Sequence, residues 1–126
     1  MIIGIGVDTV LVRRIRDALN RHGTRLAEKL LTPYELQRFN SHGQPARYLA
    51  KRFAVKEAFS KAMGTGIHNP VTWRKIGTAH DEQGAPVIAM HPDLEAFALA
   101  RGITHTHVSV TDEEQHAVAF VILERL

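Results

Sequence analysis

Three charged residues in largely apolar surroundings are the first candidates for chemistry. Glu57 and Lys61 are four residues apart within a run of Ala, Phe, Val and Met, and Asp8 follows a short apolar stretch. Residues four apart on a helix lie one turn apart on the same face. An isolated pair of this kind is most often a simple ion pair at the rim of a core. Two carboxylates that meet could instead hold a hard divalent cation and leave coordination sites for water and phosphate.

The elements that must position these residues can be predicted from the same stretches. Residues 47–63 contain no Gly or Pro and consist mostly of good helix formers, Pro45 suits a first turn, and Gly64 suits a C-terminal cap. Apolar residues lie nearly all the way round this predicted helix, so we expect it to be buried. Residues 1–7 are typical of a buried strand, and we expect Asp8 to end that strand where the chain leaves the sheet.

The other predicted elements place this helix in an α+β fold, with helices packed on a mainly antiparallel sheet. A capping box at Thr32 opens a helix that runs through Phe39. The strand at 117–123 is apolar on both faces, which is typical of a central or interface strand. Further helices are expected at 13–22, 24–31 and 92–101, and further strands at 71–80, 86–90 and 104–111.

Composition limits the class of protein. The chain has 126 residues, 44% of them hydrophobic, which fits a single domain, 1–126, with one compact core. No cysteine is present, so disulfides, thiolate catalysis and thiolate zinc sites are excluded. We expect a cytoplasmic protein, because the sequence shows neither a membrane-spanning run nor a secretory signal. The net charge of +3 favours polyanionic partners but does not choose among nucleic acid, phosphorylated cofactors and acidic proteins.

Basic and histidine-containing segments are open to two interpretations each. The segment 13–25 contains five arginines and only one acidic residue, Asp17. It is either a solvated helix face or a docking site for an acidic partner. His105 and His107 share one face of a predicted strand. They could be zinc ligands, or they could simply belong to a polar sheet face. The Gly64–Gly66 stretch could end the helix or approach a phosphate. The five arginines are Arg13, Arg14, Arg16, Arg21 and Arg25.

Three blocks in this order carry a resemblance to a known family. They are Gly6-x-Asp8, the central run Arg52-Phe-Ala-Val-Lys-Glu-Ala-x-x-Lys-Ala-x-Gly-Thr-Gly-Ile67, and His107-Val-Ser109. Together they resemble the bacterial holo-acyl-carrier-protein synthases, small members of the 4'-phosphopantetheinyl transferase superfamily. The resemblance spans nearly the whole chain and implies transfer of the 4'-phosphopantetheine arm from CoA to a serine of apo acyl carrier protein, in support of fatty acid biosynthesis. It also implies trimers with CoA held between adjacent subunits.

The resemblance implies roles for individual residues. Asp8 and Glu57 would bind Mg²⁺, and Glu57, directly or through a metal-bound water, would accept the serine proton. Lys61 would stabilise the departing phosphate. Arg14 would contact the acidic carrier protein, with Arg21 and Arg25 as extensions of that site. Contacts to CoA would come from Arg47, Arg52, Lys61, Gly64, Thr65, Gly66, His107 and Ser109.

Two points qualify these assignments. Lys56 would extend a basic path with Arg47 and Arg52 towards phosphate, although helical projection turns Arg52 and Lys56 away from Glu57, towards a neighbouring subunit or solvent. Many family members carry Glu three residues after the strand-end Asp, and here Leu11 occupies that place.

The alternative function is a small basic nucleic-acid-binding module, which would suit the Arg-rich segment but not acids within the best-organised part of the chain.

Overall fold

The computed structural model describes residues 1–126 and contains helices and strands along the whole chain. In chain order the elements are β1 (Ile2–Leu11), α1 (Val12–His22), α2 (Thr24–Leu30), α3 (Pro33–Asn40), α4 (Pro45–Met63), the 3-10 helix η1 (Trp73–Lys75), β2 (Ile76–His80), β3 (Pro86–Met90), α5 (Pro92–Ala100), β4 (His105–Asp112) and β5 (His116–Glu124).

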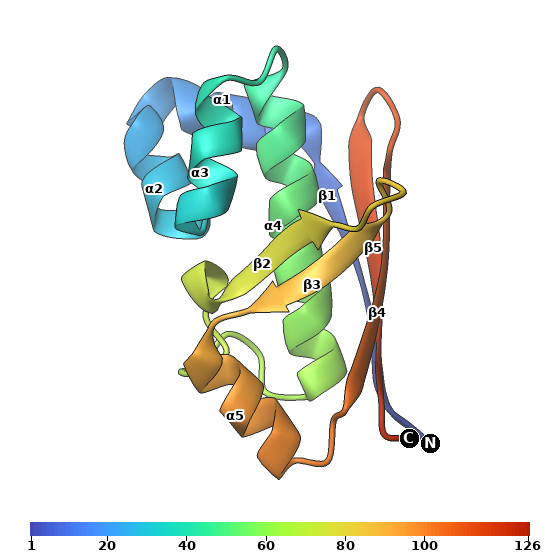
Figure 1. Ribbon diagram of the computed structural model, residues 1–126. Helices are drawn as coiled ribbons and strands as arrows, with labels where there is room; N and C mark the ends of the chain where they lie inside the picture. Colours follow the sequence, from blue (N-terminus) through green and yellow to red (C-terminus); the bar gives the residue numbers. More distant parts are fainter.

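Helix α4 is the centre of the molecule. An antiparallel sheet with the strand order β1-β5-β4 lies along one side of it, and the antiparallel hairpin β2–β3 crosses another (Figure 1). Helices α1 to α3 pack around its N-terminal half (Figure 1). Most residues of α4 are buried, and Gly64 ends it in the left-handed conformation with φ of 75°. The α+β fold and the burial of this helix are therefore confirmed.

Strand β1 lies unusually close to α4. A Cβ atom added to Gly4 would come within 2.0 Å of the carbonyl oxygen of Ala62, and one added to Gly6 within 2.0 Å of that of Ala58. Glycine therefore lets the strand and the helix backbone touch. Because side chains alternate along a strand, Asp8 points to the same side as Gly4 and Gly6, towards α4.

The predicted end of the first strand was wrong. Strand β1 continues to Leu11, and Asp8 lies within the ladder, opposite Ala119 of β5. The physical reason is the length of β5, which offers partners to β1 as far as Leu11. Asp8 therefore stands on an edge strand of the sheet and not in a loop.

The prediction of one continuous strand at 71–80 was also wrong. Val71 forms an isolated bridge with His68, residues Trp73–Lys75 form η1, and β2 begins only at Ile76. The carbonyls of Trp73 and Ile76 both accept hydrogen bonds from the buried Lys56 ammonium, which draws this segment towards α4. A contact between residues so far apart in sequence could not be seen in the local pattern.

Strand β5 occupies the middle of the three-stranded sheet, as its apolar character predicted. Its inner face is buried against α4, whereas its outer face leaves Phe120 41% exposed. Ile5 and Val7 of β1 lie beside it on that outer face, 61% and 52% exposed. We call this surface the outer sheet face; it consists of Ile5, Val7, Val118, Phe120, Ile122, His107 and Ser109.

Candidate active site

Asp8 and Lys61 meet across the contact between β1 and α4. The Lys61 ammonium lies 2.9 Å from Asp8 Oδ1 and donates a second hydrogen bond, of 3.1 Å, to the carbonyl of Val7. The Asp8 side chain is 16% exposed and that of Lys61 56% exposed. The simple ion pair between Lys61 and Glu57 is not formed, because Lys61 turns to the strand. Two of the three expected catalytic residues are thus in direct contact.

Glu57 lies one helical turn before Lys61 and is half-buried. Its carboxylate accepts a 3.0 Å hydrogen bond through Oε2 from the indole Nε1 of Trp73. This is the only hydrogen bond that the Glu57 side chain makes within the chain. Glu57 and Lys61 therefore lie on one side of α4, and Asp8 of the edge strand β1 contacts Lys61 there.

The free oxygens of the two carboxylates match the preferences of Mg²⁺. Asp8 Oδ2 and Glu57 Oε1 have no partner within the protein, while their other oxygens are held by Lys61 and Trp73. Mg²⁺ in proteins is commonly bound by one or two carboxylates, with water and substrate phosphates completing its octahedron. No group of three or more His, Cys, Asp or Glu residues suited to a metal is present. The residues thus fit a cation that takes further ligands from a phosphorylated substrate.

Lys56 does not belong to a basic path along α4, so that expectation was wrong. Its ammonium is fully buried, 2.6 Å from Glu35 Oε1, and it donates to the carbonyls of Trp73 and Ile76. Burial lowers the pKa of Lys56, and the adjacent Glu35 carboxylate opposes that shift. Helical projection predicted the direction away from Glu57 but could not show that α3 and β2 cover that side.

Arg52 is also buried, with only 3% of its surface exposed. Its guanidinium lies 5.1 Å from the ring centroid of Tyr48, it forms no ion pair, and its Nε has no hydrogen-bond partner. Burial lowers the pKa of the Arg52 guanidinium. The structure does not bring Arg52 to the side of Glu57, and its contact with CoA stays a prediction.

The other residues predicted to contact CoA lie in three places. Gly64, Thr65 and Gly66 follow α4, with φ of 75° at Gly64 and 64° at Gly66, and Thr65 Oγ1 donates to the carbonyl of Gly66. His107 and Ser109 stand on the outer sheet face, and His107 Nε2 lies 2.8 Å from Glu124 Oε1. That hydrogen bond lowers the pKa of Glu124. Arg47 contacts Asp112 at the end of β4, with 3.8 Å between Nε and Oδ2.

The arginines predicted to dock the carrier protein lie on one part of the surface. Arg14 and Arg21 belong to α1, and Arg25 belongs to α2. All three are exposed, and none forms an ion pair within the chain. Their charges are therefore free to meet an acidic partner.

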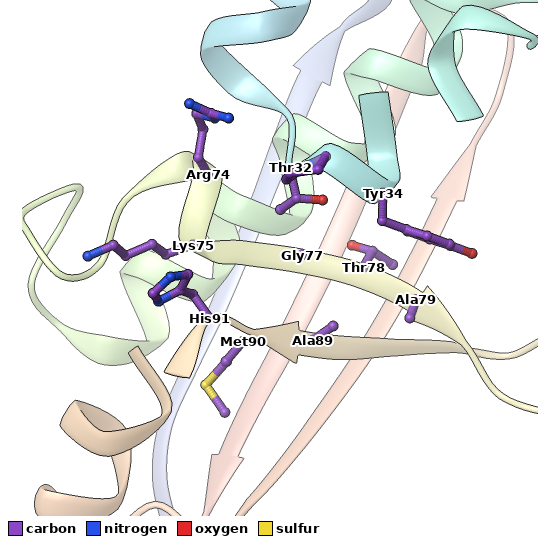
Figure 2. A pocket seen from close by; sticks show the side chains of 11 residues that line it. Thr32, Tyr34, Arg74, Lys75, Gly77, Thr78, Ala79, Ala89, Met90 and His91 are labelled. Carbon is purple, nitrogen blue, oxygen red and sulfur yellow. The ribbon is translucent and has the colours of Figure 1, made fainter. Parts of the chain in front are cut away.

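A pocket of about 260 Å³ lies apart from these residues, between the start of α3 and the β2–β3 hairpin. Figure 2 shows Arg74, Lys75 and His91 at one end of it and Tyr34 at the other. None of the predicted site residues lines this pocket. Asp8, Glu57 and Lys61 therefore lie outside this cavity.

Comparison with known proteins decides the family. The model of the 4'-phosphopantetheinyl transferase superfamily matches residues 4–121. The chain belongs to this superfamily. The match includes all three blocks quoted from the sequence and therefore Asp8, Glu57 and Lys61.

Relatives of this transferase chain are similar over their full length. This chain is 48% identical over 124 residues to the holo-[acyl-carrier-protein] synthase of Laribacter hongkongensis, and the match covers 98% of this chain and 99% of that protein. The crystal structure of the synthase from Neisseria meningitidis matches with a TM-score of 0.96 and 45% identity, over 99% of this chain and 100% of that one. The Bacillus anthracis synthase in complex with CoA (3',5'-ADP) matches with a TM-score of 0.82 and 31% identity, over 100% and 99%. None of the helices of this transferase chain has the length and apolar character needed to span a membrane.

Sequence reasoning missed two residues of this transferase that contact the candidate site or its support. Trp73 donates a hydrogen bond to Glu57. Residues 71–80 were predicted to form a strand, and no motif singled out Trp73. Glu35 was predicted only as the second member of the Thr32 capping box, which the structure confirms. Its carboxylate also binds Lys56 and the amide of Thr78. The predicted burial of the helix that carries Lys56 was the only signal that this lysine needed a buried partner.

Proposed function

We propose that this chain transfers the 4'-phosphopantetheine arm of CoA to a serine of apo acyl carrier protein and releases adenosine 3',5'-bisphosphate. The observation that carries the proposal is the contact between Asp8 of β1 and Lys61 of α4, with Glu57 one helical turn before Lys61. The superfamily match and the names of the relatives support it. We place the reaction in the cytoplasm and its product in fatty acid biosynthesis.

The reaction consists of three changes at the substrates. The serine oxygen forms a bond to the pyrophosphate phosphorus nearest the pantetheine, the bond from that phosphorus to the bridging oxygen breaks, and the serine loses its proton. Glu57 accepts that proton, either directly or through a water that the cation would hold. The Lys61 side chain is exposed enough to contact the pyrophosphate of CoA. Its positive charge stabilises the negative charge that grows on the departing bisphosphate.

Asp8 and Glu57 would hold Mg²⁺ through Oδ2 and Oε1, the two oxygens without a partner in the protein. The ion would neutralise pyrophosphate charge and align the diphosphate. Asp8 also keeps Lys61 in place through their 2.9 Å contact. Leu11, the last residue of β1, adds no further acid to the pair.

A neighbouring subunit would complete the CoA site. Asp8 lies on the inner side of β1, whereas His107 and Ser109 lie on the outer sheet face of β4, at the other edge of the same sheet. Strands two places apart are separated by about 10 Å, and the sheet itself lies between the two faces. One CoA therefore meets both sets most simply between two copies. The exposed apolar side chains of the outer sheet face support a homotrimer that buries them.

This assembly can be tested at Phe120, in the middle of the outer sheet face. We expect Phe120→Lys to weaken self-association about a hundredfold and to reduce transfer in parallel, because an unpaired ammonium would be buried in an apolar contact. Sedimentation and light scattering would follow the mass, and circular dichroism the fold. Val87→Lys, on the exposed hairpin strand β3, is the matched control. A wild-type protein that is monomeric and fully active would contradict the shared site.

The carrier protein would dock on α1 and the start of α2. Arg14, Arg21 and Arg25 offer unpaired positive charge there, which suits an acidic carrier. The alternative, a nucleic-acid-binding module, is not favoured. Its phosphates would meet the carboxylates of Asp8 and Glu57, and the relatives named above are synthases.

The function is tested by incubating the protein with CoA, Mg²⁺ and an apo carrier protein and weighing the carrier by mass spectrometry. We expect the carrier to gain the mass of one phosphopantetheine arm, and we expect chelation of Mg²⁺ to stop the gain. The control is a carrier whose acceptor serine is replaced by alanine. A carrier of unchanged mass, together with salt-dependent binding of the protein to generic DNA or RNA, would favour the alternative.

A further inference from the structure

The carboxylate of Glu57 is oriented by a single neighbour, the indole of Trp73. Trp73 Nε1 donates to Oε2 over 3.0 Å, and Lys61, one turn further along α4, turns away to Asp8. We propose that Trp73 is a positioning residue: its N–H fixes one oxygen of Glu57 and thereby presents the other to the cation and to the serine. The proposal deepens the function proposed above and rests on it for the role of Glu57.

Trp73 is itself anchored to the core through its backbone. Its carbonyl accepts a 2.9 Å hydrogen bond from Lys56 Nζ, and Lys56 is fixed 2.6 Å from Glu35. Glu35 in turn accepts from the amides of Thr32, at 3.0 Å, and Thr78, at 2.9 Å. Lys56 and Glu35 together join α4, α3, η1 and β2, so η1 cannot shift without breaking hydrogen bonds to a buried ammonium. The network therefore transmits the rigidity of the core to the indole.

The indole ring is held on its faces as well. The ring centroid of Phe53 lies 6.3 Å away at an angle of 47°, and the ammonium of Lys29 lies 5.8 Å from the Trp73 ring. Aromatic pairs and cation contacts of this kind restrict the rotation of a half-buried side chain. These contacts support the ring, and the hydrogen bond to Glu57 sets the direction of the N–H group.

A donor that orients a metal-binding carboxylate affects metal affinity. Removing such a hydrogen bond typically weakens metal binding or activity by about 10- to 100-fold. Because Trp73 would act through Glu57, its loss should affect Mg²⁺ binding and turnover. The KM for CoA should change little.

Trp73 is the only tryptophan in the chain, so its fluorescence reports on Glu57 directly. Mg²⁺ would be titrated into the wild-type protein with CoA and no carrier, where no transfer can occur. We expect the emission to change and to saturate at the Mg²⁺ concentration that half-activates transfer. Glu57→Gln should remove the change, and NaCl of equal ionic strength should not produce it. An emission that stays constant at Mg²⁺ concentrations sufficient for transfer would overturn the proposal.

Two variants separate the hydrogen bond from the packing. Trp73→Phe keeps an aromatic ring but no donor, and we expect it to raise the half-activating Mg²⁺ concentration about tenfold. Phe53→Leu removes the ring partner but leaves the indole N–H, and we expect wild-type Mg²⁺ dependence. Equal Mg²⁺ dependence in the two variants would show a packing role only and would overturn the proposal. An emission change without any transfer in the wild type would instead contradict the proposed function, so the two failures can be told apart.

Discussion

Asp8→Asn and Glu57→Gln are each expected to reduce transfer of the phosphopantetheine arm by about 10³-fold. General-base catalysis contributes about 10²- to 10⁴-fold, and loss of a metal ligand adds to that effect. Both substitutions keep the size of the side chain and one oxygen, so Lys61 and Trp73 retain an acceptor. The fold should therefore be unchanged, and the loss should appear in kcat. The mass gain of the carrier, followed over time, measures the rate.

The double variant makes this test sharper. If Asp8 and Glu57 hold one ion, Asp8→Asn with Glu57→Gln should be little worse than either change alone, because groups that act as a unit are not additive. Glu95→Gln, on the exposed side of α5, is the matched control and should keep wild-type activity. Single variants that transfer within about tenfold of the wild type would show that the site is elsewhere.

Lys56→Met is expected to lower the free energy of unfolding by about 3–5 kcal/mol, because it leaves the Glu35 carboxylate buried without its cation. The same change also removes the donor from the carbonyls of Trp73 and Ile76. Since the whole stability of a small domain is only about 5–15 kcal/mol, much of the protein should unfold at moderate urea concentrations. Urea titration followed by circular dichroism measures the effect.

Two comparisons identify its cause. Adding Glu35→Gln to Lys56→Met should restore about 1–3 kcal/mol, because the unpaired charge is then gone, although the single carboxamide oxygen can accept from only one of the amides of Thr32 and Thr78. Lys51→Met, five residues earlier on α4, should cost about 0–1 kcal/mol, since Lys51 forms only a partly exposed pair with Asp112. A double variant as unstable as the sum of the two single changes would show that the pair is not coupled.

The local sequence determined much of the scaffold. The helix formers of residues 47–63, with Pro45 before them and Gly64 after them, predicted α4 and its C-terminal cap. The capping box at Thr32 and the hairpin partner at 86–90 were predicted as the structure has them. These features depend on residues within a few positions of one another, and short-range backbone preferences decide them.

The sequence also placed Glu57 and Lys61 on one face, because helical periodicity alone requires it. Asp8 came to that face through tertiary contact. The two glycines that precede it on alternate positions, Gly4 and Gly6, bring β1 onto α4 and leave Asp8 on the inner side. A periodic pattern can tell which side a residue faces but not which element will lie there.

Tertiary structure alone decided the different fates of two lysines on the same helix. Lys61 lies beside an exposed edge strand and meets Asp8, whereas Lys56 lies beneath α3 and β2 and is sealed in the core with Glu35. The same holds for Trp73, which η1 carries to Glu57 across 16 positions of sequence. Contacts between distant segments depend on how whole elements pack, and that information is not contained in any one stretch of the chain.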